Sequence, residues 1–293
     1  MSKQFKTQIK DLFNCFKAIL YVARKGELNS KMRIQNISQA RGLTILANGP
    51  SLMKDLDKAL GRLEQDYAGL NYFGCTDLFL QVRPRYYFMM DRAFFSDTER
   101  NTRRADIKSM YERFNQFVDW KMTIIVPCHF VESFINFSKL TNSNIDVIGV
   151  NTNGLETITN IRHKFYRRNW GLPRPQNVTI LAIYCGINLG YKDIYLYGVD
   201  HTFIQDICVD EENRLCLKWE HFYDKKAKLK PVVDTLGTPH SIASELLTVA
   251  ITFRSHELIR EYADEMGCRI VNCTYGSMID SYIRESQLFN QKQ

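Results

Sequence analysis

The sequence predicts an α/β fold: a Rossmann-like, mainly parallel sheet with helices on both faces and a lid insertion. Short apolar runs typical of buried strands alternate along the chain with longer stretches that have the three- and four-residue spacing of helices. Such alternation is typical of parallel sheets covered on both faces. One long, charged and aromatic segment, residues 203–230, breaks the pattern directly after a predicted strand.

The predicted elements follow from these runs in order. Strands are expected at 43–47, 72–75, 86–90, 122–126, 146–150, 193–197 and 269–273. Helices are expected at 52–65, 102–117, 131–139, 178–189 and 242–266. A long irregular excursion after a strand end is more typical of a lid or binding loop than of scaffold, so we place a lid at 203–238.

An amphipathic helix is predicted at the N-terminus, so the chain divides into residues 1–41, helix and polar linker, and a main domain at 42–293. Basic residues complement the apolar face, and this leaves two alternatives. The helix packs on the core or on another subunit as a homo-oligomer contact, or it lies on an anionic membrane surface. The apolar face consists of Phe5, Ile9, Leu12, Phe13, Phe16, Ile19, Leu20 and Ala23.

Composition narrows the class of protein. The chain has 293 residues, 45% of them apolar, which is enough for a packed core. The net charge of +7 is compatible with nucleic acid, an anionic membrane or anionic substrates. No nucleic-acid-binding motif and no basic stripe interleaved with aromatic residues occurs, so we expect no nucleic-acid partner.

The cysteines and the hydropathy indicate a cytoplasmic protein. Eight cysteines are scattered without a CxxC pair, which favours reduced core residues over disulfides or a zinc site. No uncharged apolar run reaches the ~18 residues of a membrane span, and the N-terminus lacks the order of a secretory signal.

The turn after the first predicted strand has residues suited to binding phosphate. Asn48 and Gly49 follow the apolar run, Pro50 fixes φ, and Ser51 is placed to cap the next helix. A helix N-terminus presents free N–H groups and the positive end of the helix dipole to an anion. The motif is neither a Walker loop nor GxGxxG, and an ordinary strand-to-helix turn is the alternative.

A second group of polar residues follows the predicted strand 193–197. Asp200 and His201 stand at its carboxyl end, the edge where ligands bind in open α/β sheets. We therefore expect both residues to shape the site.

Two stretches, ILANGPSL at 45–52 and LGYKDIYLYGVD at 189–200, resemble the bacterial sialyltransferases of glycosyltransferase family 42. They also resemble a related group of polysaccharide-cluster proteins similar to archaeal pterin diphosphokinases. That group has a Gly-Val/Ala-Asp-His strand end and a later His-Phe-Tyr-Asp, which match residues 198–201 and 221–224. The resemblance extends over residues 43–280 in short islands.

The resemblance implies a set of donor-nucleotide contacts. Asn48, Gly49, Pro50 and Ser51 match the family's Asn-Gly-Pro-Ser loop. Two further family positions, both Asn in the sialyltransferases, are filled here by other residues, and the identity of the donor depends on them. Thr76 and Asp91 occupy these two positions. Asn177 and Thr179 match the family's donor-binding residues more weakly.

The resemblance also implies a histidine general base and tyrosine hydroxyls at the leaving phosphate, without a metal or other cofactor. His221 in the lid ranks first as the base, with Tyr223 nearby as a substitute for one tyrosine. His240, in a Pro-His-Ser before the last long helix, ranks second, and His201 is the third histidine. We assign His221 or His240 as base, with Asp200 and His201 as supporting residues.

A metal-dependent alternative has little support in the sequence. The single Asp-x-Asp, Asp55-Leu56-Asp57, falls inside a predicted helix, where side chains two residues apart diverge. No metal site is therefore expected.

These observations together predict a glycosyltransferase of bacterial surface-polysaccharide or lipooligosaccharide synthesis. Its partners would be a nucleotide-sugar donor, plausibly CMP-sialic acid, and a glycan acceptor that is lipid-linked at the inner face of the cytoplasmic membrane. The alternatives are an ATP- and magnesium-dependent pyrophosphoryl transferase of the pterin diphosphokinase kind and a non-catalytic nucleotide-binding protein.

Overall fold

The structure, a computed structural model, describes residues 40–98, 103–219, 228–233 and 238–290. It also describes eight positions nearer the N-terminus, namely Ile9, Leu12, Phe13, Phe16, Lys17, Ile19, Leu20 and Ala23.

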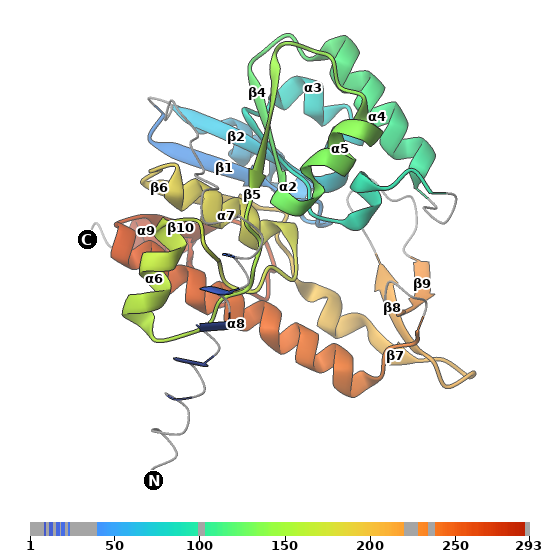
Figure 1. Cartoon of the computed structure of the whole chain (residues 1–293), viewed down its shortest axis with the longest axis vertical. Coiled ribbons are helices and arrows are strands. Elements are labelled where there is room, and N and C mark those ends of the chain that lie inside the picture. The colour runs from blue at the N-terminus through green and yellow to red at the C-terminus, as the bar shows by residue number, and fades with distance from the viewer. Residues whose placement is uncertain are drawn as a thin grey trace.

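A central sheet organises the described chain (Figure 1). Its strands are β1 Gly42–Leu46, β2 Gln65–Leu70, β3 Tyr86–Phe88, β4 Met122–Pro127, β5 Ile145–Val150, β6 Asp193–Tyr197, β10 Arg269–Asn272 and β11 Ile283–Arg284. They lie in the order β11-β10-β6-β1-β2-β3-β4-β5, and every neighbouring pair is parallel. The predicted α/β fold with a parallel sheet is confirmed.

Helices cover both faces of this sheet. They are α2 Leu52–Leu60, α3 Leu78–Val82, α4 Arg104–Phe117, α5 Val131–Ser138, α6 Thr159–Arg167, α7 Val178–Asn188, α8 Ile242–Met266 and α9 Glu285–Asn290. Side chains of β1 alternate between two cores: Leu43 and Ile45 pack with α6, α7 and α8, whereas Leu46 packs with α2, α4 and α5. The period-two alternation of a strand thus builds both layers.

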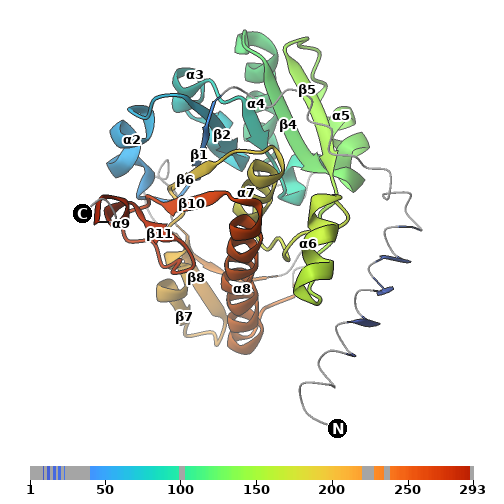
Figure 2. The ribbon, with the colours of Figure 1, turned by 90° about the vertical axis from the view of Figure 1, so that its left-hand side faces the viewer.

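Helix α7 is buried on all sides because it lies between the sheet and α8 (Figure 2). Every residue from Val178 to Ile187 is buried. A helix that is apolar all round is typical of such a position, and the continuous VTILAIYCGI run encodes it. The α7 side chains therefore form the centre of the larger core.

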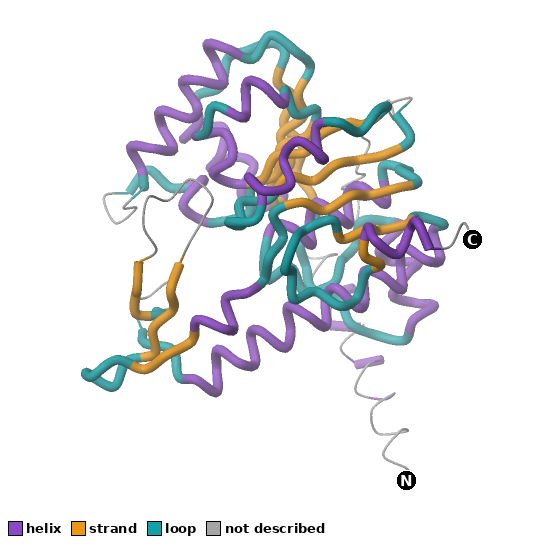
Figure 3. The backbone as a smooth tube through the Cα atoms, turned by 180° about the vertical axis from the view of Figure 1, so that it is seen from behind, coloured by secondary structure: helices purple, strands orange, loops and turns teal. Residues whose placement is uncertain are grey.

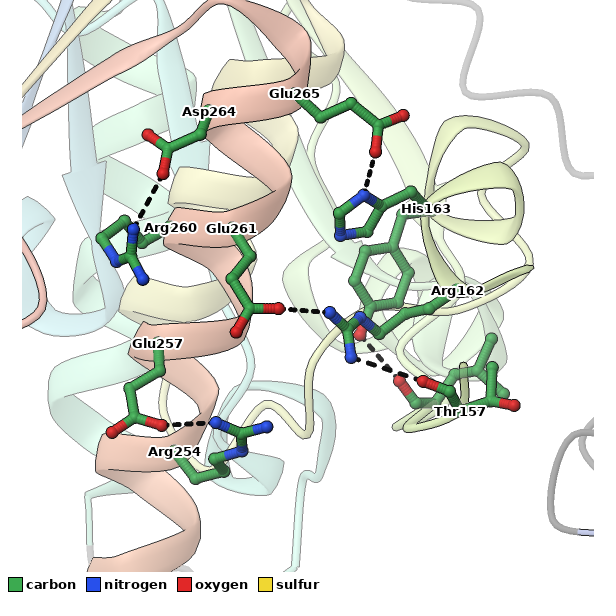
Figure 4. Close-up of polar contacts among 11 residues, drawn as sticks. Thr157, Arg162, His163, Arg254, Glu257, Arg260, Glu261, Asp264 and Glu265 are labelled. Carbon is green, nitrogen blue, oxygen red and sulfur yellow. Dashed lines mark hydrogen bonds and ion pairs between the residues drawn. The ribbon is translucent and has the colours of Figure 1, made fainter. Parts of the chain in front are cut away.

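Charged contacts join α6 to α8 (Figure 4). The Arg162 guanidinium donates to the Glu261 carboxylate at 2.5 Å and to the Thr157 carbonyl at 3.4 Å. His163 contacts Glu265, which also pairs with Arg167. Arg162 and His163 are both buried, so these pairs fix α6 against α8 beside the packed rings of Tyr166 and Tyr262.

The insertion after β6 is ordered where the structure describes it. The 3₁₀ helix η5 (Thr202–Asp206) leads into a three-stranded antiparallel sheet of β7 Ile207–Val209, β8 Leu215–Trp219 and β9 Lys228–Pro231. Figure 3 shows this small sheet apart from the main one, beside the N-terminal end of α8. We expected an irregular segment. The strands are only three to five residues long, and although Leu215–Leu217 of β8 are buried, the described residues of β7 and β9 are mostly exposed, so the apolar runs are too short to predict strands.

The prediction was wrong around the second strand. Residues 71–75 form the 3₁₀ helix η2 (Asn71–Cys75), the strand is β2, and the preceding helix ends at Leu60, where the Gly61 N–H bonds to the Asp57 carbonyl. Gln65 and Asp66 begin β2 at its partly exposed end and hide its pattern. Tyr72 and Phe73 resemble a strand in the sequence because the turn that they form after β2 is buried. Helices α3, α6 and α9 and strand β11 were not predicted.

The N-terminal helix was predicted as amphipathic, and the positions that the structure describes there are helical. Ile9, Leu12, Phe13, Phe16 and Leu20 leave 43–60% of their surface exposed. These side chains are therefore not packed into the main core. The linker at 31–39 and most of the basic residues lie outside the described residues. Within the described part of the chain, no helix has the length and apolarity needed to cross a membrane.

The burial of α7 predicts how substitutions on it change the free energy of unfolding. Leu181 is fully buried on this helix, whereas Leu63 is 86% exposed. Leu181→Ala should lower the free energy of unfolding by about 2–5 kcal/mol because it removes buried methyl groups and leaves a cavity. Leu63→Ala, the same substitution on the surface, should change it by less than about 0.5 kcal/mol. Urea unfolding measures both, and equal effects would contradict the assigned burial of α7.

Candidate functional site

The topology places the candidate site where the strand order reverses. The chain runs from β1 outward to β5 and then returns to β6, which pairs with the other side of β1. In doubly wound sheets ligands bind outside the carboxyl ends of the strands at this switch point. The loop after β1, residues 48–51, and the loop after β6, residues 198–201, meet there.

The Asp200 carboxylate holds these two loops together. It accepts the Ser51 N–H at 3.2 Å and the Ser51 hydroxyl at 2.8 Å, and the Gly49 N–H bonds to the Gly198 carbonyl at 2.9 Å. Asp200 and Ser51 are both buried. Burial raises the pKa of the Asp200 carboxyl, and the bonds from Ser51 oppose that rise.

Close approach explains the glycine at position 49. A Cβ atom there would overlap the Asp200 carboxylate and lie 2.5 Å from the Gly198 carbonyl oxygen. The Asn-Gly-Pro-Ser motif thus serves loop packing, whatever else it binds. Pro50 forms part of the turn and brings no N–H.

The N-terminus of α2 is already occupied by a carboxylate. We expected Ser51 to cap this helix and the helix end to offer free N–H groups to a phosphate. The Ser51 side chain makes no capping hydrogen bond, because both Ser51 donors serve Asp200. The Leu52 N–H bonds to the Gly49 carbonyl, and the Lys54 N–H bonds to the Ser51 carbonyl. Asp200 therefore takes the place of the anion at this helix end.

Asn48 is the residue of this loop with an unused group. Its Nδ2 donates to the Leu70 carbonyl at 2.9 Å, which fixes the amide against the end of β2. Its Oδ1 is buried and has no hydrogen-bond partner among the described residues. An unsatisfied buried acceptor costs about 1–3 kcal/mol, so this atom is suited to receive a donor from a ligand.

The next two strand ends add polar residues beside Asn48. Asn71 follows β2 in the left-handed conformation, and its Oδ1 accepts the Met90 N–H at 3.3 Å. Asp91 follows β3 and caps the 3₁₀ helix η3 (Arg92–Phe95) by accepting the Ala93 N–H at 3.0 Å. Thr76 stands six residues beyond the end of β2 and donates to the Phe73 carbonyl at 2.7 Å.

A histidine pair lies behind the β6 end. The His201 Nε2 is 3.0 Å from the Asn177 Nδ2 and 3.1 Å from the His256 Nε2, and the His256 Nδ1 is 2.8 Å from the Tyr282 hydroxyl. Asn177 caps α7 by accepting the N–H groups of Thr179 and the next residue. The structure thus brings Asn177 and His201 together, while Thr179 is buried in α7.

Burial lowers the pKa of His201 to about 4, although the side chain keeps part of its surface exposed. Burial also holds the pKa of His256 well below its usual value, and a positive charge on His201 would lower it further. Both rings are therefore neutral at pH 7.

The other candidate histidines lie elsewhere. His240 precedes α8, its N–H bonds to the Val232 carbonyl, and its Nδ1 is 3.0 Å from the Glu245 carboxylate. The start of α8 lies fourteen residues before His256, or roughly 21 Å at 1.5 Å per residue, so His240 lies at the end of α8 next to the insertion. His221 and Tyr223 lie outside the described residues.

The described residues contain no cluster of three or more His, Cys, Asp or Glu side chains that could hold a metal. Asp55 and Asp57 both lie in α2, as predicted, and point apart: Asp55 is buried and accepts the Tyr275 N–H at 3.0 Å, whereas Asp57 is exposed. The cysteines of the described residues are free thiols. Cys185, Cys216, Cys268 and Cys273 are core residues as predicted, but Cys75 and Cys208 are exposed because they lie in a surface turn and a surface strand.

Sequence reasoning missed three residues at this site. Asn71 would have been found if β2 had been placed correctly, because it directly follows that strand. His256 and Tyr282 lie in α8 and near the C-terminus, with no local signal that they meet His201.

Comparisons with known proteins add a similarity of fold. No protein-family model and no curated protein matches the chain. Among solved structures, the chain is similar to a MAf glycosyltransferase from Magnetospirillum magneticum AMB-1, with a TM-score of 0.48 and 14% sequence identity over 86% of this chain. This chain covers 35% of that protein. A similarity at this level does not bear on activity or substrate, and the resemblance to sialyltransferases stays a prediction.

The lowered histidine pKa values predict a pH dependence of stability. The unfolded chain binds more protons than the folded chain between about pH 4 and 6.5, so stability rises with pH across this window and falls on acidification. His201→Gln should make this rise smaller. His129→Gln, at an exposed ring on the 3₁₀ helix η4 (Cys128–Phe130), should leave it unchanged. Urea unfolding at pH 5 and pH 7 compares the variants, and an undiminished rise in His201→Gln would contradict a buried neutral ring.

Proposed function

We propose that the protein is a glycosyltransferase that binds a nucleotide-sugar donor at the β1/β6 switch point, with CMP-sialic acid as the first candidate. The acceptor is a glycan of bacterial surface polysaccharide or lipooligosaccharide. The fold class, the polar strand ends and the resemblance of the two sequence motifs support this assignment together.

The observation that carries the proposal is the unsatisfied Oδ1 of Asn48. The Nδ2 bond to the Leu70 carbonyl keeps the amide from rotating away, so the free acceptor is held in place at the strand end. Ribose hydroxyls and the exocyclic amine of cytosine are donors of the required kind. Asn71 and Asp91 on the next strand ends extend the polar edge along which a nucleoside would lie.

The donor phosphate then lies toward Asn177 and His201. This places it away from the α2 N-terminus, where Asp200 already supplies the negative charge. The antiparallel sheet of the insertion follows His201 directly and acts as the lid over the sugar and the acceptor.

His221 and His240 remain the candidates for the base that deprotonates the acceptor hydroxyl. Because the start of α8 lies roughly 21 Å from His256, His240 reaches the donor only when the insertion closes over the site. The Glu245 carboxylate, 8% exposed, faces the His240 Nδ1. A carboxylate at that nitrogen favours the tautomer that leaves Nε2 as proton acceptor, which is the pairing a general base requires. His221 lies within the insertion by sequence, whereas His240 follows its end.

The exposed apolar residues of the N-terminal helix support a peripheral contact with an anionic membrane, where lipid-linked acceptors are found. By sequence, the predicted helix also includes the basic residues Lys3, Lys6, Lys10, Lys17, Arg24 and Lys25.

Ligand binding tests the donor site. In thermal-shift titrations with CMP, UDP, GDP and ATP, CMP should raise the melting temperature without magnesium. Asn48→Ala should weaken CMP binding at least about tenfold, because the ligand loses a buried hydrogen bond. Asn136→Ala, on the exposed face of α5, is the matched control. Stabilisation by ATP that requires magnesium would instead favour a pyrophosphoryl transferase.

Substitution of the two histidines tests the base. His240→Ala or His221→Ala should reduce turnover by about 10²–10⁴-fold while nucleotide binding persists. Turnover is measured with CMP-sialic acid in EDTA. Unchanged turnover in both variants would refute the base assignment, and nucleotide binding without any turnover in wild type would favour a non-catalytic protein.

A further inference from the structure

Four side chains next to the proposed site are connected by a continuous series of hydrogen bonds. The order is Tyr282, His256 and then His201, which Asn177 also contacts. His256 is fully buried, and Tyr282 is 5% exposed. These hydrogen bonds connect α8 and the C-terminal segment to the end of β6.

Because Asn177 caps α7, the direction of donation in these hydrogen bonds is determined. Its Oδ1 accepts the N–H groups of Thr179 at 3.0 Å and Ile180 at 3.2 Å, so its amide nitrogen must be the atom that faces His201. An amide nitrogen donates and cannot accept. The His201 Nε2 therefore accepts, and in a neutral ring the proton is on Nδ1.

The remaining bonds follow in one direction. Because the His201 Nε2 carries no proton, the His256 Nε2 must donate to it, which leaves the His256 Nδ1 as an acceptor. The Tyr282 hydroxyl then donates to the His256 Nδ1. The reverse direction would set a His201 Nε2–H against the Asn177 amide donor at 3.0 Å.

The free nitrogen of His201 points away from this series of hydrogen bonds. No described residue bonds to Nδ1, and the two ring nitrogens of an imidazole diverge. His201 itself is in the left-handed conformation, φ 52°, between the end of β6 and the insertion. Its Nδ1–H is thus presented on the side opposite to Asn177 and His256.

We propose that Asn177, His256 and Tyr282 are positioning residues that lock His201 as the neutral Nδ1–H tautomer, so that His201 donates a hydrogen bond to a phosphate oxygen of the bound donor. The phosphate part of this statement rests on the proposed function, whereas the tautomer does not. His201 is accordingly a donor and not the base of the reaction. The lowered pKa values of both rings agree with a neutral pair.

Nitrogen NMR of ¹⁵N-histidine-labelled, ligand-free protein at pH 7 tests the tautomer. His201 should show a protonated Nδ1 and an unprotonated Nε2, and His256 the opposite arrangement. His201→Gln and His256→Gln assign the signals among the six histidines. A protonated His201 Nε2, or a doubly protonated ring, would overturn the proposal.

Asn177→Asp replaces the amide donor that faces His201 with an acceptor. The helix cap is preserved, because Asp and Asn cap equally well. A carboxylate oxygen facing His201 should draw a proton onto Nε2. Asn136→Asp, on exposed α5, should leave the His201 signals unchanged. An unaltered His201 spectrum in Asn177→Asp would overturn the assigned role of Asn177.

Calorimetric titration with CMP and with cytidine tests the phosphate contact. Asn177→Asp should weaken CMP binding more than tenfold and cytidine binding less than threefold. Equal losses for the two ligands, or no loss for CMP, would overturn the donor role of His201. Failure of wild type to bind CMP would refute the proposed function, and with it the phosphate contact, while the tautomer result would stand on its own spectrum.

Discussion

The Asp200 carboxylate, by accepting both the N–H and the hydroxyl of Ser51, ties the loop after β1 to the loop after β6. Those strands are neighbours in the sheet, and the chain between them winds through the whole of one half of the fold. Closing the switch point in this way brings the two motifs into one site. It also requires glycine at position 49, because a side chain there would displace the carboxylate.

The same contact determines which groups of the site are free to bind a ligand. Asp200 occupies the helix end that a phosphate would otherwise use, so the proposed phosphate contact involves other polar residues of the site. Asn48 holds an unused acceptor on one side, and His201 holds an unused donor on the other. A ligand that presents both donor and acceptor groups, as a nucleotide does, matches that arrangement. The layers behind these residues, above all α7 and α8, hold them in place.

Much of this could be predicted because the signals are local. Strand β6 and helix α8 have the bounds that their apolar patterns predict, and Asn48, Ser51, Asp200 and His201 stand at the strand ends where the sequence puts them. Strand β2 was missed because its polar first residues hide its period, and Asn71 was missed with it. The insertion was expected to be irregular because its strands are short, and only β8 is buried among the residues whose burial is described.

The sequence by itself determined the fold class, the alternation of strands and helices and the two motif loops, since each is encoded in neighbouring residues. The tertiary structure decided which groups in those loops are free. Ser51 is engaged because Asp200, 149 residues away, reaches it, and the proton of His201 is placed by Asn177, His256 and Tyr282 from three separate segments. Hydrogen-bond partners meet in space at long sequence separation, so no local pattern records them.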